Sequence, residues 1–413
     1  MLPVAAAAQP SIARDVRVAT SGAPAIVAAE APFEAAAVSW RETSGTANVR
    51  VRASSDRSAW TPWIDAPIDH DLTDADGGRR FTGIVHFGAS QRYLEYAFDS
   101  AEPAEATVTL FAPPDPSVRA LEVEQPLAIG PLRVRSRVEW GCPDGAGARW
   151  KPAYTRVTHA VVHHTAGAND LPDWDAEVRN IWHYHTVTRG WGDIGYNYLI
   201  TPTGVVYEGR AGGLGAIGAH FSCRNTNTVG IAILGTYSNG IPRTEALDAL
   251  TRLVGALTSL HGIDPDAFAI HAPTTLLLPV IPGHRDANSS GCSTTECPGD
   301  ALYSWLPILR SALGACEMPE VTSQPISVTI ERGGSATLTV SATGSEPAYQ
   351  WYTGKWGRTE SPIAGATSPS LTVSPSSTTR YWVRVSSVCG SADSADALVI
   401  VPTEGRRRAV GRP

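Results

Sequence analysis

The sequence is poor in lysine. Lys151 and Lys355 are the only lysines among its 413 residues, so arginine carries almost all of the positive charge. A mechanism that requires a catalytic lysine therefore has at most two candidate residues.

The sequence also lacks an excess of positive charge and long apolar runs. Its formal net charge is −7, which argues against a nucleic-acid-binding protein that works by neutralising phosphates. No apolar run reaches the roughly 18 residues that a membrane-spanning helix needs, so we expect no membrane span. Hydrophobic residues still make up 43% of the chain, which is enough for several folded cores and excludes a mostly disordered protein.

Cysteines are few. The six are Cys142, Cys223, Cys292, Cys297, Cys316 and Cys389. This number is too small for a disulfide scaffold but suits an exported protein with one or two bridges. Residues 1–10 contain a run of alanines at 5–8 that resembles the small-residue end of a secretory signal, without its basic part and full apolar part. We therefore expect a protein that is secreted, extracellular or held in the cell envelope.

Short runs of alternating apolar and polar residues occupy the first part of the chain. The expected strands are residues 37–40, 49–52, 83–87, 93–97 and 106–111. Alternation of this kind between turns rich in Asp, Gly and Ser is typical of a half-buried antiparallel sheet. We predict a jelly-roll-like β-sandwich.

The central part of the chain has a different pattern. Strand-like runs at 158–164, 196–200 and 229–234 alternate with helical periods at 175–188 and after Pro298. A further helix is expected from an N-cap at Thr244 to a stop at Gly262, and Pro307 predicts a kink or restart in the last helix. This pattern predicts an α/β domain, a mixed sheet flanked by helices.

The last part of the chain returns to short alternating strands. They are expected at residues 326–330, 336–340, 349–352, 370–373, 381–385 and 397–401. A tryptophan, Trp351, lies on the third of them. This arrangement resembles an immunoglobulin-like β-sandwich.

We therefore predict a multidomain chain with an α/β domain between two β-sandwiches. The segments are an exported or disordered arm (1–30), a β-sandwich (31–113), a linker (114–134), the α/β domain (135–315), an immunoglobulin-like domain (316–402) and a basic tail (403–413).

The motifs that carry chemistry lie in the central domain, together with nine of the eleven histidines. In chain order they are VVHHTA (161–166), WGDIGYNY (191–198), YEGR (207–210), GAH (218–220), NTNTVGI (225–231), GHRD (283–286) and CPGD (297–300). Together they resemble the zinc amidases that cleave N-acetylmuramoyl-L-alanine bonds. That family includes peptidoglycan recognition proteins and phage amidases historically called lysozymes.

The resemblance implies a zinc ion held by His163, His284 and Cys297. A catalytic zinc takes three protein ligands and leaves one position for water, whose pKa it lowers for attack on the amide. Adjacent residues of a strand face opposite sides, so only one of His163 and His164 reaches the metal. The family uses the first. His164 is then expected to pack in the core or to contact a ligand residue without binding the metal.

The cysteine ligand is not settled by spacing. The family usually places it eight residues after the histidine, which here is Cys292. Cys297 instead carries the Pro-Gly-Asp that opens the last helix, and Thr-Glu precedes it as in many relatives. We read residues 289–293 as an insertion and favour Cys297, with Cys292 as the alternative.

Two further positions match catalytic positions of the family. Tyr196 matches its active-site tyrosine, whose phenol could hold the water or stabilise the oxyanion, with a core aromatic as the alternative. Thr295 stands where phage relatives have a lysine and recognition proteins often a threonine. The glutamate of another amidase subfamily is replaced by Ala232, so that general base is absent.

Substrate contacts follow from the same resemblance, and the disulfide candidates follow from the five cysteines that remain once Cys297 is set aside. Arg210, His220 and Asn225 match positions that line the stem-peptide groove, and Arg210 could pair with a carboxylate. His185 and Trp191 are candidates for the groove wall, with a structural role equally open. A Cys223–Cys292 bridge and a Cys142–Cys223 bridge are competing possibilities.

The expected function is zinc-dependent hydrolysis of the amide between N-acetylmuramic acid and L-alanine, by a monomer whose partner is peptidoglycan. The β domains would position the enzyme on the wall or serve as spacers. The alternatives are a non-catalytic peptidoglycan receptor, which typically lacks the ligand cysteine, and a surface-adhesion protein with a passive central domain.

Overall fold

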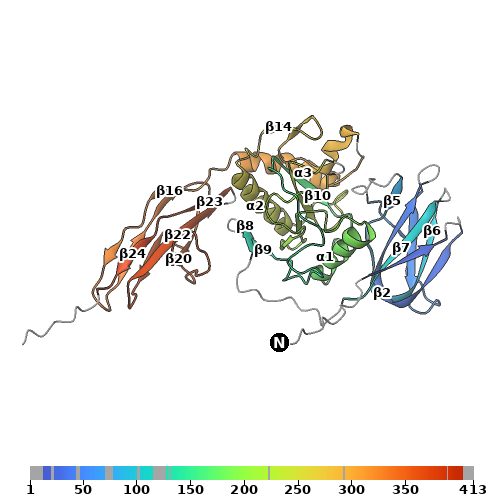
Figure 1. Ribbon diagram of the computed structural model, residues 1–413, viewed down its shortest axis with the longest axis horizontal. Helices are drawn as coiled ribbons and strands as arrows, with labels where there is room; N and C mark the ends of the chain where they lie inside the picture. Colours follow the sequence, from blue (N-terminus) through green and yellow to red (C-terminus); the bar gives the residue numbers. More distant parts are fainter. Residues whose placement is uncertain are drawn as a thin grey trace, which may run out of the picture. The chain divides into compact units, whose positions relative to one another are not determined.

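The structure is a computed structural model (Figure 1). It describes residues 13–19, 23–42, 47–69, 78–99, 103–114, 127–129, 132–221, 224–291, 294–387 and 389–402. Cys223, Cys292 and the predicted basic tail lie outside these ranges. None of the helices that the structure describes is both long and apolar enough to cross a membrane.

The N-terminal domain is built from strands that form one sheet. They are β1 (Ala13–Val18), β2 (Ala25–Arg41), β3 (Val49–Ser54), β4 (Ile64–Asp65), β5 (Arg79–Phe81), β6 (Val85–Phe98) and β7 (Ala104–Phe111). Their order is β1-β7-β2-β6-β3-β4, with β5 paired to β2. Alternate residues of these strands, such as Val38, Val51 and Leu94, form its core.

The predicted arm over residues 1–30 requires a correction. Residues 13–18 form β1, which pairs antiparallel with β7 from Ala13↔Phe111 to Val18↔Ala106, and β2 begins at Ala25. β1 and the start of β2 were not predicted, because alanine and charged residues occupy their outward positions and weaken the alternating pattern. Part of the predicted linker is also strand, at β8 (Leu127–Ile129) and β9 (Leu132–Arg135).

The central domain is a mixed sheet with helices, as predicted. Its further strands are β10 (His159–His164), β11 (Tyr198–Ile200), β12 (Val206–Glu208), β13 (Thr228–Ile233) and the hairpin β14 (Phe268–His271) and β15 (Leu276–Pro279). In the sheet, β10 runs parallel to β13 and β13 runs parallel to β11, whereas β11 and β12 are antiparallel. Every residue of β10 and β13 is buried.

The helices agree with the predicted periodicity except at two points. They are α1 (Trp174–His183), the π-helical turn η2 (Tyr184–Thr188), α2 (Thr244–His261), the 3₁₀ helix η3 (His284–Ser290) and α3 (Asp300–Gly314). The predicted N-cap at Thr244 is wrong by one residue, because Arg243 occupies that position. The predicted stop at Gly262 is confirmed by its left-handed φ of 64°. α3 continues through Pro307 without a restart.

The C-terminal domain has its own core and a disulfide. Its strands are β16 (Glu320–Ser323), β17 (Val328–Thr329), β18 (Ala336–Thr339), β19 (Ser341–Thr343), β20 (Ala348–Thr353), β21 (Ser370–Val373), β22 (Thr379–Ser387), β23 (Gly390–Asp393) and β24 (Ala397–Ile400). The sheet β17-β24-β22-β20 packs Trp351 and Val383 against Leu338 and Leu371 of the β18–β21 pair. This is the predicted two-sheet arrangement.

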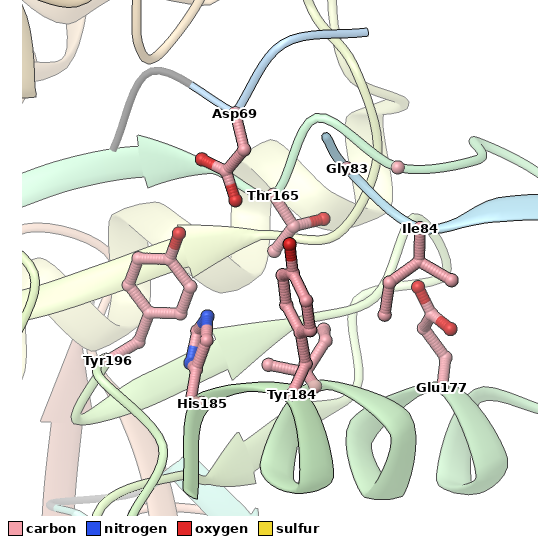
Figure 2. Close-up of a pocket in the computed structure, with 10 residues that line it drawn as sticks. Asp69, Gly83, Ile84, Thr165, Glu177, Tyr184, His185 and Tyr196 are labelled. Atoms are coloured by element: carbon pink, nitrogen blue, oxygen red, sulfur yellow. The ribbon is translucent and has the colours of Figure 1, made fainter. Parts of the chain in front are cut away.

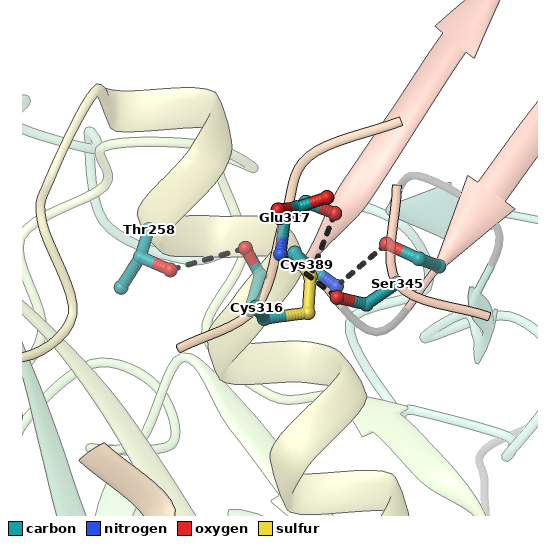
Figure 3. The surroundings of a disulfide bond; sticks show 7 residues. Thr258, Cys316, Glu317, Ser345 and Cys389 are labelled. Atoms are coloured by element: carbon teal, nitrogen blue, oxygen red, sulfur yellow. Dashed lines mark hydrogen bonds between the residues drawn. A yellow bond between two sulfur atoms is a disulfide. The ribbon is translucent and has the colours of Figure 1, made fainter. Parts of the chain in front are cut away.

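A disulfide between Cys316 and Cys389 joins the start of this domain to the connection between β22 and β23. Figure 3 shows Glu317 and Ser345 beside it: the Glu317 N–H donates to Ser345 Oγ at 2.9 Å, and the Ser345 N–H donates to the Glu317 carbonyl at 3.1 Å. Sequence analysis did not anticipate this pairing.

The described chain divides into two compact units. One contains the N-terminal domain and the central domain from Arg133 to Ser311, and the other contains the C-terminal domain together with Ala128–Leu132. Within the first unit a single apolar cluster joins residues of both domains: Ala13, Ala35, Ala37, Phe81, Ile84 and Phe111 from the N-terminal sheet, and Val178, Ile181, Trp182 and Tyr184 from the helical segment α1–η2. The N-terminal sheet therefore shares a core with the central domain.

Candidate metal centre

Three side chains with metal-binding atoms converge at the end of β10. They are His163, His284 and Cys297, whose donor atoms all lie within 4.8 Å of one another. Their exposed fractions are 0%, 1% and 2%. His163 Nδ1 lies 3.5 Å from Cys297 Sγ.

Backbone contacts hold the three ligand-bearing segments together. The chain before His284 runs beside β10, where the Val162 N–H donates to the Pro282 carbonyl at 2.9 Å. The Arg285 N–H donates to the Cys297 carbonyl, also at 2.9 Å. His284 is therefore tied to the strand of His163 on one side and to the segment of Cys297 on the other.

His164 faces away from this cluster, as strand alternation requires. Its Nδ1 accepts a hydrogen bond from the Tyr237 N–H at 3.2 Å. The expectation that only one of the two adjacent histidines contributes to the cluster agrees with this geometry.

A chain of hydrogen bonds fixes which nitrogen of His163 carries its proton. The Thr228 hydroxyl donates to the Asn225 carbonyl at 2.6 Å, so its oxygen accepts from His220 Nε2 at 3.2 Å. His220 Nδ1 is then unprotonated and accepts from His163 Nε2 at 3.0 Å. His163 Nδ1 is left unprotonated on the side of Cys297, which is the form that binds a metal.

Two glycines make room for the ring of His220. A Cβ atom at Gly230 would lie 2.3 Å from the His220 ring, and one at Gly218 would lie 2.4 Å from it. No real side chain tolerates such contacts, so both positions require glycine. The predicted groove residue His220 is therefore buried behind His163.

Thr295 and Asn288 position the cysteine. The Cys297 N–H donates to Thr295 Oγ1 at 3.0 Å, and Asn288 binds the Thr295 backbone twice, at 3.0 Å each. Thr295 is buried. Its hydroxyl thus supports the backbone of Cys297.

A pocket adjoins Tyr196 (Figure 2). The volume that a water-sized group can occupy in it is about 20 Å³, and Tyr196 and His185 lie on one side of it. The rings of Tyr196 and His163 are 5.3 Å apart. The Gly195 N–H donates to His185 Nδ1 at 3.1 Å, so the neutral ring carries its proton on Nε2. Trp191 packs against His185 with ring centroids 4.8 Å apart.

Arg210 and Asn225 lie in structural positions and are not among the described residues that line this pocket. The Arg210 guanidinium donates to the Ile194 carbonyl at 3.1 Å and lies 4.0 Å from the Trp150 ring. Burial lowers the pKa of Arg210 to about 10. Asn225 Oδ1 accepts from the N–H groups of His220 and Phe221, at 2.7 Å each.

Cys142 is a free, buried cysteine. The alternative Cys142–Cys223 bridge is therefore wrong. The Cys223–Cys292 bridge and the alternative metal ligand Cys292 fall outside the described residues.

The donor set fits a zinc ion. Zinc is bound by imidazole nitrogen at about 2.0 Å and thiolate sulfur at about 2.3 Å in tetrahedral sites. Such a site places nitrogen and sulfur roughly 3.5 Å apart, as His163 Nδ1 and Cys297 Sγ are. Two imidazoles and one thiol, all buried, leave a fourth position for another ligand.

Thr228 and Asp193 were not predicted as functional residues, although both lie in the family motifs. Asp193 Oδ1 accepts from Arg137 at 3.0 Å and from the Ile194 N–H at 2.8 Å, and its Oδ2 accepts from the Ala211 N–H at 2.8 Å. It is fully buried with Arg137, and it anchors the segment that leads to Tyr196. A buried acid inside a glycine-rich motif was the available signal.

Each domain matches a described family. Residues 153–300 match N-acetylmuramoyl-L-alanine amidase, residues 3–108 match the galactose-binding domain-like family of the Rv3811 N-terminus, and residues 318–402 match an Ig-like domain termed CHU_C associated. The predicted fold class of three domains, two of them β-rich and one α/β, is confirmed.

Curated relatives match the central domain. Peptidoglycan-recognition protein SC1a/b of Drosophila simulans is 32% identical over 174 residues, which are 41% of this chain and 82% of the relative. The N-acetylmuramoyl-L-alanine amidase of Homo sapiens is 31% identical over 182 residues, 43% of this chain and 28% of that protein.

A solved structure, Drosophila PGRP-LB, is 28% identical with a TM-score of 0.33, covering 41% of this chain and 89% of that one. The identity and coverage of the curated relatives place the central domain in one group with them. The chain belongs to the family of peptidoglycan recognition proteins and N-acetylmuramoyl-L-alanine amidases.

Proposed function

We propose that this protein hydrolyses the amide between N-acetylmuramic acid and L-alanine in peptidoglycan, with zinc held by His163, His284 and Cys297. The observation that supports this most strongly is the convergence of all three buried donor atoms within 4.8 Å. A chain that only recognises peptidoglycan has no need of the cysteine at this position.

When bound, zinc would supply a Lewis acid that activates water and polarises the amide carbonyl. The Tyr196 phenol, beside the His163 ring, would donate a hydrogen bond to the oxygen on which negative charge develops. His185 presents its Nε2–H on the same side of the pocket. Thr295 acts here as a positioning residue, because its hydroxyl oxygen accepts from the Cys297 N–H.

His220 and Thr228 would act as positioning residues behind the metal. They keep His163 in the tautomer with an unprotonated Nδ1. Partners of this kind typically contribute about 10- to 100-fold to metal affinity. Groove contacts remain a prediction for Trp191, Arg210 and Asn225.

We also propose that the protein acts outside the cytoplasm. The Cys316–Cys389 disulfide supports this, because disulfides persist in oxidising compartments. Peptidoglycan is itself extracellular, so enzyme and substrate would meet there. A monomer remains our prediction.

The test of the activity uses the purified full chain and insoluble peptidoglycan. We expect release of new L-alanine amino groups, loss of release with a chelator, and recovery on adding zinc. Cys297→Ser should lower the rate by at least about 100-fold, and Tyr196→Phe by about 100-fold, as for loss of one oxyanion donor. Cys142→Ala, at another free cysteine of the described part of the chain, is the matched control and should keep its activity.

Binding of peptidoglycan without any release by the unmodified chain would overturn the proposal and identify a non-catalytic recognition protein. Release that persists unchanged in Cys297→Ser would overturn the ligand assignment.

The orientation of His163 has a separate test. Thr228→Val removes the acceptor for His220 Nε2–H and should weaken zinc binding by about tenfold or more in competition with a chelator. Thr226→Val, at an exposed position two residues away, is the control. Equal zinc affinities of these two variants would contradict the role of Thr228.

A further inference from the structure

The pocket beside Tyr196 is lined by two domains. Asp69, Gly83 and Ile84 belong to the N-terminal domain, yet they line the same pocket as Tyr196 and His185. Figure 2 shows the Asp69 carboxylate and the Ile84 side chain reaching into the pocket on the side opposite His185 and Tyr196. Family motifs in the central domain carry no signal for this wall.

Hydrogen bonds pair the backbone of the N-terminal wall. The Gly83 N–H donates to the Pro67 carbonyl at 2.8 Å, the Asp69 N–H donates to the Phe81 carbonyl at 2.9 Å, and Ile68 forms a β-bridge with Thr82. Asp69 is 8% exposed. The backbone of Asp69 is thus paired with a neighbouring segment, which limits where its carboxylate can lie.

The two walls are fastened to each other at several points. A Cβ atom at Gly83 would lie 2.5 Å from the Ala166 carbonyl oxygen, three residues beyond His163, so the backbones are in direct contact. The Tyr184 hydroxyl donates to the Thr82 carbonyl at 3.1 Å. The pocket is therefore part of one packed unit.

The lining chemistry defines the kind of group that fits. Among the described lining residues are two carboxylates, Asp69 and Glu177, and the hydroxyl groups of Thr165, Tyr184 and Tyr196, with no lysine or arginine. Glu177 pairs with His86 at 3.0 Å, and each oxygen of a carboxylate can accept more than one hydrogen bond. An acidic wall of this kind disfavours a phosphate or carboxylate and accepts hydrogen bonds from hydroxyl, amide or ammonium groups.

We propose that the N-terminal domain forms the second wall of the substrate cleft and that Asp69 binds substrate by accepting hydrogen bonds from such a donor. This inference rests on the proposed function. Two parts of a muropeptide carry donors: the hydroxyl and acetamido groups of the muramyl sugar, and an amino group on the side chain of the stem peptide. Asp69 would make the cleft selective for substrates that carry such a donor, and the central domain alone would lack this selectivity.

The experiment measures kcat and KM of the full chain on three soluble substrates. They are N-acetylmuramoyl-peptide with a free side-chain amine, the same compound with a hydrogen atom in place of that amine, and an O-methyl-lactoyl-peptide that keeps the amide and the amine but lacks the sugar. Asp69→Asn keeps the size of the side chain and removes its charge, and Asp69→Glu restores the charge. Asp65→Asn, at an exposed position of the same domain, is the matched control.

We expect Asp69→Asn to raise KM on the first substrate by about tenfold or more, the value of a hydrogen bond to a charged group, with kcat changed less than about twofold. Asp69→Glu should recover part of the loss, and Asp65→Asn should match the unmodified chain. On the substrate that lacks the relevant donor, Asp69→Asn and the unmodified chain should have equal KM values, and this substrate identifies the source of the donor.

Equal KM values of Asp69→Asn and the unmodified chain on all three substrates would overturn the inference. Thermal unfolding of each variant verifies that the fold is kept. If the unmodified chain cleaves none of the substrates, the proposed function fails, and the wall is then tested by calorimetric Kd values on the same compounds. A Kd unchanged by Asp69→Asn overturns the inference, whereas a Kd weakened by about tenfold supports it.

Discussion

The two β-rich domains that flank the central domain relate to it differently. In the N-terminal domain, Ala35, Phe81 and Ile84 belong to the same apolar cluster as Ile181 and Tyr184 of the central domain. In the C-terminal domain, the cluster around Trp351 and Val383 contains residues of that domain alone, and a disulfide closes it.

This difference separates a part of the larger compact unit from a module. The larger unit contains the N-terminal and central domains and is called the catalytic unit below because it carries the proposed active site. A domain that shares a core with its neighbour contributes to the neighbour's stability and shape, whereas a domain with its own core can be lost or exchanged. The N-terminal domain is therefore expected to affect the stability and shape of the cleft beside Tyr196. The C-terminal domain is expected to have no effect on the cleft and to contribute, if at all, by binding a partner of its own.

Removing each domain in turn should give the largest contrast. A chain that begins at residue 114 loses the sheet that covers Val178, Ile181 and Tyr184, at about 1.5–3 kcal/mol for each large side chain. We expect it to aggregate or to unfold at least about 10 °C lower in calorimetry. A chain that ends at residue 315 should keep both the unfolding midpoint of the catalytic unit and the release of L-alanine groups from soluble muropeptides.

Equal losses of stability in the two shortened chains would contradict the comparison. Full activity of the chain that begins at residue 114 would show that the shared cluster has no consequence for the cleft.

The disulfide of the C-terminal domain provides the next contrast. It closes a loop with a sequence separation of 73 residues, for which loop entropy predicts a stabilisation of about 4 kcal/mol. The double variant Cys316→Ala/Cys389→Ala should lower the unfolding transition of that domain only. Calorimetry that resolves two transitions measures this. A fall in the midpoint of the catalytic unit as well would contradict the independence of the module.

A single glycine tests the shared core from the other side. Gly83→Val would place a Cβ atom 2.5 Å from the Ala166 carbonyl oxygen and should cost about 1–3 kcal/mol, the usual range for overpacking. Urea unfolding of the catalytic unit measures the loss. Gly240→Val, where nothing lies within 4 Å of an added Cβ atom, should change stability by less than about 0.5 kcal/mol. Equal free energies of unfolding of the two variants would show that the close contact between the domains at Gly83 does not contribute to stability.

The sequence predicted elements better than the contacts between them. Alternation revealed most strands of both flanking domains because it depends on local burial, but it missed β1 and the first part of β2. It does not say what lies beyond the buried face. Ala35 and Ala37 look like ordinary strand residues, yet their small side chains allow α1 and η2 to pack closely against β2.

The candidate site shows the same division. His163, His284 and Cys297 could be proposed because each lies in a motif, and the structure brings their donor atoms together. Asp69 could not be proposed, because its place in the cleft depends on how two domains pack. His220 lay in a motif, but its burial behind His163 depends on the space that Gly218 and Gly230 leave.

The smallest expected effect concerns the ion pair between the domains. Burial alone would lower the pKa of His86, but Glu177, with a contribution from Glu34, raises it above the ordinary value of 6.5. A raised pKa means that the folded state binds the proton more tightly than the unfolded state does. The stabilisation is fully present below pH 6.5 and is lost as the pH rises through the folded-state pKa.

His86→Asn should therefore lower the unfolding midpoint by a few degrees, roughly 2 °C, at pH 6, and by less at pH 9. His261→Asn is the control, because burial lowers the pKa of His261. The effect of His261 on stability therefore changes with pH only below pH 6.5. Each variant is compared with the unmodified chain at the same pH. This comparison cancels the contributions to stability of other buried groups, such as His159, for which burial lowers the pKa to about 4. A loss in His86→Asn that is equal at both pH values would mean that packing, and not charge, joins the N-terminal sheet to α1.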